Sequence, residues 1–237
     1  MAPAQNHKGS QQAMDETHSL INISPQVGKG FNRDYWSRFE AFVKRLASGK
    51  GHEVFVVTGP LYLPHRAPDG KGWVMEHPML GEPPSMVSVP THFYKVVLVE
   101  QKGSEAGRPA RLSCGAFVMP NAPIDPAMPL EAFAVPLTQL ESVSGLTFFP
   151  GLINEERRLQ LDGSSVRCRQ AALASLSSTS TVPLLEGSSS AAAPANKSPS
   201  PGAKQPAHLC EAFACKLPAQ EFWLSSKQSP EDVEVEE

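Results

Sequence analysis

Two apolar segments separated by a short polar loop place the strongest limit on how this chain folds. The segments are MVSVPTHFYKVVLVE (86–100) and ARLSCGAFVMPN (110–121), and the loop between them contains KGSEAGRP. Runs of β-branched and aromatic residues favour strands, and a short polar connection favours an antiparallel hairpin. A third run, EVFVVTGPLYL (53–63), predicts a buried strand ahead of that hairpin. The centre of the fold is therefore expected to be an antiparallel sheet.

Helical spacing occurs before and after these strands. In NRDYWSRFEAFVKRLAS (32–48) the apolar residues recur every three or four positions, and Asn32 stands at the position of an N-cap. The segment PLTQLESVSG (136–145) predicts a shorter helix that Gly145 closes. The helices and the antiparallel strands together predict an α+β fold.

The composition changes near residue 156 and divides the chain into three parts. Residues 1–155 predict a packed domain, whereas 156–207 are rich in Ser, Ala and Pro and nearly free of aromatic residues. Such a segment buries too little apolar surface to offset the entropy of ordering, so we expect a disordered linker. Residues 208–237 begin with HLCEAFACKLPAQEFW and end in EDVEVEE, which predicts a short docking segment followed by an acidic tail.

Charge and cysteine content exclude several classes of protein. The formal net charge of the 237 residues is -3, so the chain as a whole has no strong positive field for nucleic acid or an anionic membrane. No run of about eighteen apolar residues occurs, so no membrane-spanning segment is expected. The four cysteines lack a CxxC pair, which leaves free thiols in a reducing compartment or a Cys210–Cys215 disulfide in an oxidising one.

Three residues of the predicted helix could share one face. Asn32, Trp36 and Glu40 are four positions apart, which places them within roughly 80° of one another around a helix axis. An amide oxygen at a helix start could hold a hard cation such as Mg²⁺, which needs only one or two protein ligands. Alternatively, Asn32 caps the helix and Glu40 pairs with Lys44 on the solvated face. The spacing alone leaves both interpretations open.

Several segments in order along residues 2–155 carry a resemblance to a known family. They are APAQNHKGSQQAMDET (2–17), LINISPQVGKGFNRDYWSRFE (20–40), VFVVTGPLYLP (54–64), VSVPTHFYKVVL (87–98), FVMPNAPID (117–125) and VPLTQLESVSGLTFFP (135–150). Together they resemble the DNA/RNA non-specific endonucleases, the ββα-metal nucleases that include endonuclease G and fungal mitochondrial nucleases. The resemblance implies part of a ββα-metal fold, in which an antiparallel sheet carries the helix of the metal site.

The resemblance also implies roles for individual residues. Asn32 would be the direct protein ligand of Mg²⁺, with Mn²⁺ as an alternative ion, and Glu40 would be the catalytic residue that hydrogen-bonds a metal-bound water. Asn22 and Gln26 would line the site, and Trp36 would pack beneath the metal helix. DNA and RNA would be the substrates of a homodimer, and the full-length family form would be mitochondrial.

One family motif is missing from this sequence. The signature Asp-Arg-Gly-His, which supplies the general-base histidine, stands immediately before the Ala-Pro-Ala segment in the family and does not occur in the 237 residues. We therefore expect a truncated form of a longer nuclease, without its general-base histidine and without the first half of the ββα finger. Two functions are expected: a Mg²⁺-dependent, sugar-non-specific endonuclease, or a non-catalytic nucleic-acid-binding or dimerisation module derived from one. The compartment of this chain stays unassigned.

Overall fold

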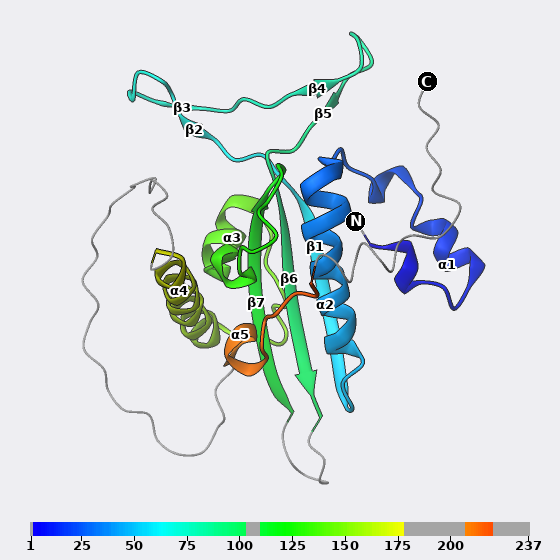
Figure 1. Ribbon diagram of the computed structural model, residues 1–237, viewed down its shortest axis with the longest axis vertical. Helices are drawn as coiled ribbons and strands as arrows, with labels where there is room; N and C mark the ends of the chain where they lie inside the picture. The colour runs from blue at the N-terminus through cyan, green and yellow to red at the C-terminus, as the bar shows by residue number, and fades with distance from the viewer. Residues whose placement is uncertain (1, 103–109, 178–206, 220–237) are drawn as a thin grey trace.

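An antiparallel sheet forms the centre of the computed structural model, which describes residues 2–102, 110–177 and 207–219 (Figure 1). In spatial order its strands are β1 (His52–Leu61), β6 (His92–Gln101), β7 (Arg111–Pro120) and β8 (Ala134–Val135), with β9 (Ala207–His208) paired parallel to β7. The predicted hairpin is confirmed, because β6 and β7 pair antiparallel over their full length. The α+β class is confirmed with it.

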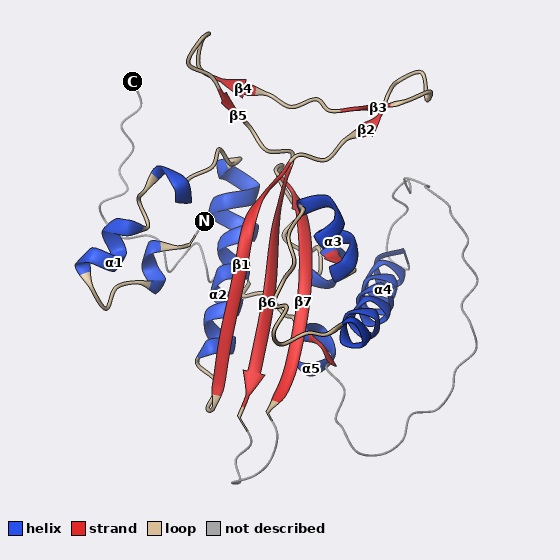
Figure 2. Cartoon of the chain, turned by 180° about the vertical axis from the view of Figure 1, so that it is seen from behind, coloured by secondary structure: helices blue, strands red, loops and turns tan. Residues whose placement is uncertain are grey.

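Helices cover the two faces of this sheet with separate hydrophobic cores. Helix α2 (Ser37–Ala47) continues from the helical segment η3 (Gly28–Trp36) and lies along β1 and β6 (Figure 1). Seen from behind, α2 passes behind β1 (Figure 2). Phe39, Phe93 and Phe117 pack into the core on the α2 side, and Val96, Leu98 and Leu140 pack into the core on the other. Helix α3 (Leu137–Ser144) covers this second face and ends at Gly145, as predicted.

The connection between β1 and β6 forms two small hairpins that project beyond the end of the sheet (Figures 1 and 2). Their strands are β2 (His65–Arg66) with β3 (Trp73–Val74) and β4 (Met79–Leu80) with β5 (Val87–Ser88). The strand predicted over 86–100 is therefore two strands. Pro90 lacks the backbone N–H that a ladder needs, and it lies between β5 and β6.

Strand β1 is more exposed than its apolar sequence predicted. In the part of the chain that the structure describes, β1 pairs with β6 along one side and with no strand along the other. Phe55 and Val56 each keep 41% of their surface exposed. The prediction of a buried strand is wrong here because burial depends on neighbouring elements that a run of apolar residues does not specify.

A long helix occupies the start of the segment predicted to be disordered. Helix α4 (Glu155–Ser177) packs Leu161 beside Phe148, and the Arg158 guanidinium pairs with the Glu141 carboxylate at 3.1 Å. The prediction is wrong over 156–177, because this part is rich in the strong helix formers Arg, Leu, Gln and Ala and has a surface to pack on. Residues 178–206 of the predicted linker lie outside the described residues.

Residues 207–219 return to the sheet after that linker. Leu209 of helix α5 (Leu209–Ala212) is fully buried in the core on the α2 side. Two arginines of α2 hold the segment: Arg38 donates to the Pro218 carbonyl and Arg45 to the Lys216 carbonyl, each at 2.6 Å. The acidic end, 220–237, lies outside the described residues. Within the described parts, no helix is both long and apolar enough to span a bilayer.

The remaining short elements lie near the amino terminus and after β7. They are η1 (Ala4–Asn6), α1 (Gln11–Glu16), η2 (Leu20–Asn22) and η4 (Leu130–Phe133). The first three form the chain that leads to the predicted metal helix, so they decide what surrounds its amino end.

Candidate functional site

The start of the predicted metal helix is fixed by a glycine. Gly30 has φ +82°, and a Cβ at this position would lie 2.7 Å from the Cβ of Pro123. The Asp34 carboxylate accepts the Gly30 N–H, and Asn32 donates its own N–H to the Val27 carbonyl at 2.9 Å. Asn32 therefore lies in the first helical turn, and the prediction that it is the N-cap is wrong. Its backbone carbonyl accepts the Ser37 hydroxyl at 2.7 Å, and the residue is half-buried.

Asn121, at the end of β7, fastens the segment that precedes this helix. Its side-chain oxygen accepts the Val27 N–H at 2.8 Å. Its side-chain nitrogen donates to the carbonyls of Pro25 at 3.2 Å and Pro90 at 2.9 Å. The sequence analysis did not identify this residue, because an Asn after a strand is an ordinary turn residue and its partners are distant in sequence.

Asn32 and Gln26 share a cavity of about 340 Å³ at the amino end of the helix. Asn22 and His18 also line it. The side-chain nitrogen of Gln26 is buried and has no hydrogen-bond partner among the described residues. Burying an amide donor without a partner costs free energy, and such a donor is commonly satisfied by an acceptor oxygen of a ligand or of water.

The Asn22 side chain makes hydrogen bonds to the backbone of the amino-terminal segment. Its side-chain oxygen accepts the Ala2 N–H at 2.7 Å, and its nitrogen donates to the carbonyls of Ala2 at 2.9 Å and Thr17 at 2.7 Å. The side chain thus lines the cavity and ties the two ends of the segment 2–17 to η2.

Glu40 lines a second cavity of about 360 Å³, two helical turns from Asn32. Lys95 of β6, Thr58 of β1 and His7 line the same cavity. The two cavities have Ala2 in common, so the amino-terminal segment runs between them. Asn32 and Glu40 thus lie on one continuous helical segment but line different cavities. His18 lines the cavity of Asn32, and His7 lines the cavity of Glu40.

Trp36 lies between them and faces inward. It is 2% exposed and packs on Phe31 at 5.4 Å and Phe93 at 5.9 Å between ring centroids. The Lys95 ammonium lies 4.3 Å from the centroid of the Trp36 ring. Burial lowers the pKa of Lys95 to about 8, and the negative charge of Glu40 opposes this shift. Lys95 was not among the residues predicted for the site, although a lysine inside the apolar run HFYKVVLV is a sequence signal for a buried charge.

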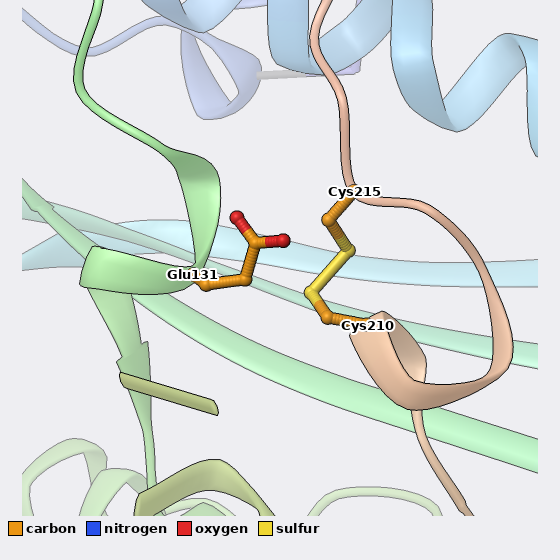
Figure 3. A group of neighbouring side chains, drawn as sticks. All are labelled: Glu131, Cys210 and Cys215. Atoms are coloured by element: carbon orange, nitrogen blue, oxygen red, sulfur yellow. A yellow bond between two sulfur atoms is a disulfide. The ribbon is translucent and has the colours of Figure 1, made fainter. Parts of the chain in front are cut away.

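Apart from these cavities, Glu131, Cys210 and Cys215 form a compact group of metal-ligating residue types (Figure 3). The cysteines are joined in a disulfide with a Cα–Cα distance of 5.2 Å, so their sulfurs are not thiolates. Of the two alternatives left open by the sequence, the structure has the disulfide. Cys114 and Cys168 are free.

The residues around the two cavities fit a hard cation that keeps most of its water. Asn32, Gln26 and Glu40 offer amide and carboxylate oxygens, the donors that such ions prefer. The described residues contain no cluster of three His, Cys, Asp or Glu ligands here. An ion at this place would therefore have few protein ligands. The unpaired Gln26 side-chain nitrogen is a donor, so it fits an acceptor oxygen, such as that of a phosphate or of a water beside the ion.

Comparison with known proteins identifies the family. Residues 1–155 match the family model of the DNA/RNA non-specific endonucleases. The chain belongs to this family. Its members are metal-dependent nucleases, and the loop–helix unit that carries Asn32 and Glu40 lies within the matched residues.

Similar family members occur in fungi and animals. The chain is 45% identical over 156 residues to "Nuclease 1, mitochondrial" of Schizosaccharomyces pombe, a match that covers 66% of this chain and 47% of the relative. It is 47% identical over 152 residues to "Nuclease C1" of Cunninghamella echinulata, covering 64% and 56%. It is 40% identical over 153 residues to human "Endonuclease G, mitochondrial", covering 65% and 48%. The chain thus spans about half the length of these relatives.

A solved family structure has the same fold in the matched part. The crystal structure of an EndoG/EndoGI complex, which concerns the mechanism of EndoG inhibition, aligns with a TM-score of 0.56 at 43% identity. The alignment covers 67% of this chain and 60% of that one. This match supports the partial ββα-metal nuclease fold expected from the sequence.

Proposed function

We propose that the surface around Asn32 and Glu40 is the metal-holding part of a Mg²⁺-dependent endonuclease site for DNA and RNA. The observation that carries the proposal is the cavity at the start of η3, where Asn32 lies beside a buried Gln26 amide without a partner. Membership of the non-specific endonuclease family supports the same reaction. Mn²⁺ is the alternative ion, because it accepts the same oxygen donors.

The residues of the site have complementary tasks. The Asn32 side-chain oxygen holds the ion, and the Gln26 side-chain nitrogen donates to a phosphate oxygen. When bound, Mg²⁺ supplies positive charge against the phosphate and the leaving oxygen. The Glu40 carboxylate accepts hydrogen bonds from water beside the ion and so fixes the direction of that water. Recognition of phosphate and not of base edges accounts for action on both DNA and RNA.

A second candidate is a module that binds nucleic acid or dimerises without cleaving. It is favoured by one observation: Asn32 and Glu40, which a nuclease site would use together, line two separate cavities. The histidine that lines the Glu40 cavity in this chain is His7, which is exposed. Replacing His7 by Ala tests whether it serves as a base.

The deciding experiment is a plasmid-nicking and RNA-degradation assay with Mg²⁺, with Mn²⁺ and with EDTA. Metal-dependent cleavage that is lost in Asn32→Ala and reduced in Gln26→Ala supports the nuclease. Gln12→Ala is the matched control, because Gln12 is an exposed amide on α1. A folded chain that binds labelled duplex in Mg²⁺ but leaves it intact supports the non-catalytic module. Cleavage unaffected by Asn32→Ala refutes the assignment of the metal ligand.

A homodimer belongs to the same proposal, because the family resemblance implies one. Sedimentation velocity at micromolar concentration measures it directly. A chain that stays monomeric while it cleaves nucleic acid refutes the dimer and leaves the nuclease proposal intact.

A further inference from the structure

Lys95 is a buried cation in the wall of the Glu40 cavity. It lies near the middle of β6, is 3% exposed, and is paired across the sheet with Thr58 of β1 and Phe117 of β7. Its ammonium lies 4.3 Å from the Trp36 ring centroid and 5.6 Å from that of Phe39. Ammonium groups are attracted to aromatic faces, and more strongly where water is excluded.

Packing alone does not account for a lysine at this position. The residues of β6 on the same face, Phe93 and Val97, are fully buried and apolar. A Met or Leu at position 95 would fill the same space without the cost of removing a charge from water. The charge at this position therefore needs a negatively charged partner whose attraction offsets the free-energy cost of burying the ammonium.

That partner is Glu40. Lys95 and Glu40 line the same cavity, one from the sheet and one from the helix that covers it. Burial lowers the pKa of Lys95 to about 8 and the Glu40 carboxylate raises it, so the ammonium is largely protonated at neutral pH. Trp36, which lies under the ammonium, is on the same continuous helical segment as Glu40. Lys95 therefore contacts this segment through Trp36 and acts electrostatically on the Glu40 carboxylate.

We propose that Lys95 is a positioning residue of the nuclease site, acting through Glu40. Its ammonium draws the Glu40 carboxylate toward the inner wall of the cavity and limits the directions in which the carboxylate accepts hydrogen bonds from water. With 3% of its surface exposed, Lys95 does not meet substrate itself. The inference rests on the proposed function for its effect on cleavage. The coupling between the two side chains can be measured without cleavage.

The test is a double-mutant cycle with Lys95→Met, Glu40→Gln and the double variant. Met has nearly the length of the lysine stem and no charge. In the cleavage assay we expect Lys95→Met to lower kcat by about 10- to 100-fold with little change in KM for the nucleic acid, as for other residues that orient a site through a neighbour. In the Glu40→Gln background the same substitution should cost less than about 3-fold, because its effect passes through Glu40. Lys95→Arg, which keeps the charge, should recover part of the loss.

Urea unfolding of the same four proteins gives the second readout. Glu40→Gln should lower the urea midpoint while Lys95 is present, because the buried ammonium loses its counter-charge. In the Lys95→Met background it should leave the midpoint nearly unchanged. The control pair is Lys102, which follows β6, and Glu53 of β1, which form an exposed salt bridge. Lys102→Met should change neither kcat nor the coupling between Lys95 and Glu40.

Each outcome decides one of the two proposals. Equal kcat losses from Lys95→Met in both backgrounds, or equal midpoint shifts from Glu40→Gln in both, overturn the role of Lys95 and leave the nuclease proposal standing. A wild-type chain that does not cleave refutes nuclease activity of this chain. In that case the urea cycle still decides whether Lys95 acts on Glu40.

Discussion

His208 makes the stability of the docked carboxy-terminal segment depend on pH. Its side chain is fully buried, and its ring lies 6.1 Å from that of Phe117. Nδ1 accepts the Cys210 N–H at 3.2 Å, and Nε2 has no hydrogen-bond partner among the described residues. Burial lowers the pKa of His208 from 6.5 to about 4; the Glu211 charge opposes this shift to a smaller extent, and the Arg167 charge adds to it.

The sign follows from which state binds the proton. Between pH 6.5 and about pH 4 the unfolded chain is protonated at this histidine and the folded chain is not, so acid favours unfolding. The contribution of His208 is fully present above pH 6.5, falls as the pH drops through this window, and changes no further below pH 4. At about 1.4 kcal/mol for each pH unit, the loss is about 3 kcal/mol.

The assay is urea unfolding at pH 7.5, 6, 5 and 4 for the wild-type protein and His208→Asn. The Asn oxygen can take the Cys210 N–H but does not titrate. Its smaller size lowers stability by the same amount at every pH. The unfolding free energies of the two proteins should therefore converge by about 3 kcal/mol between pH 7.5 and 4. The lowered pKa of His92 contributes equally to both and cancels in the difference.

Leu209→Met is the matched control in the same segment. This nearly isosteric change costs less than about 1.5 kcal/mol and leaves His208 in place. Its unfolding free energy should run parallel to that of the wild type at all four pH values. A difference between wild type and His208→Asn that does not change with pH would refute the reasoning, because it would mean that His208 is not held neutral in the folded state.

Two further predictions concern the supports of the site, and a third concerns the disulfide of the docked segment. Gly30→Ala should lower the unfolding free energy by about 2–4 kcal/mol, because the added Cβ meets Pro123 and the positive φ is strained. Gly145→Ala is the control: its φ is +69° but the added Cβ meets open space, so the loss should be only about 1 kcal/mol. Asn121→Ala should cost about 1–3 kcal/mol and raise the Mg²⁺ concentration needed for half-maximal cleavage, because it leaves the Val27 N–H unpaired; an unchanged Mg²⁺ dependence would contradict this. Reducing the Cys210–Cys215 disulfide should cost about 2 kcal/mol in urea unfolding, and a Cys→Ser double variant should be insensitive to the reductant.

The sequence by itself determined the types of the main elements. The β-branched and aromatic runs in 91–100 and 110–121 are local signals, and the hairpin follows from the short loop between them. The spacing of Phe39, Phe42 and Leu46 likewise determined the helix that covers the sheet. The family resemblance selected Asn32 and Glu40 because a set of segments in order is more specific than any one motif. These features depend on residues that are near one another in the chain or on a long pattern.

Only the tertiary structure decided which residues meet. Lys95 is 55 positions from Glu40 and lines the same cavity because β6 lies under α2. Asn121 supports the start of the helix from the far end of β7, and Gly30 is required because Pro123 packs against it. The disordered interpretation of 156–177 failed because the helix formers of this part have a surface to pack on: Leu161 packs beside Phe148, and Arg158 pairs with Glu141. Local sequence encodes backbone preference, whereas burial and electrostatic partners arise from contacts across the fold.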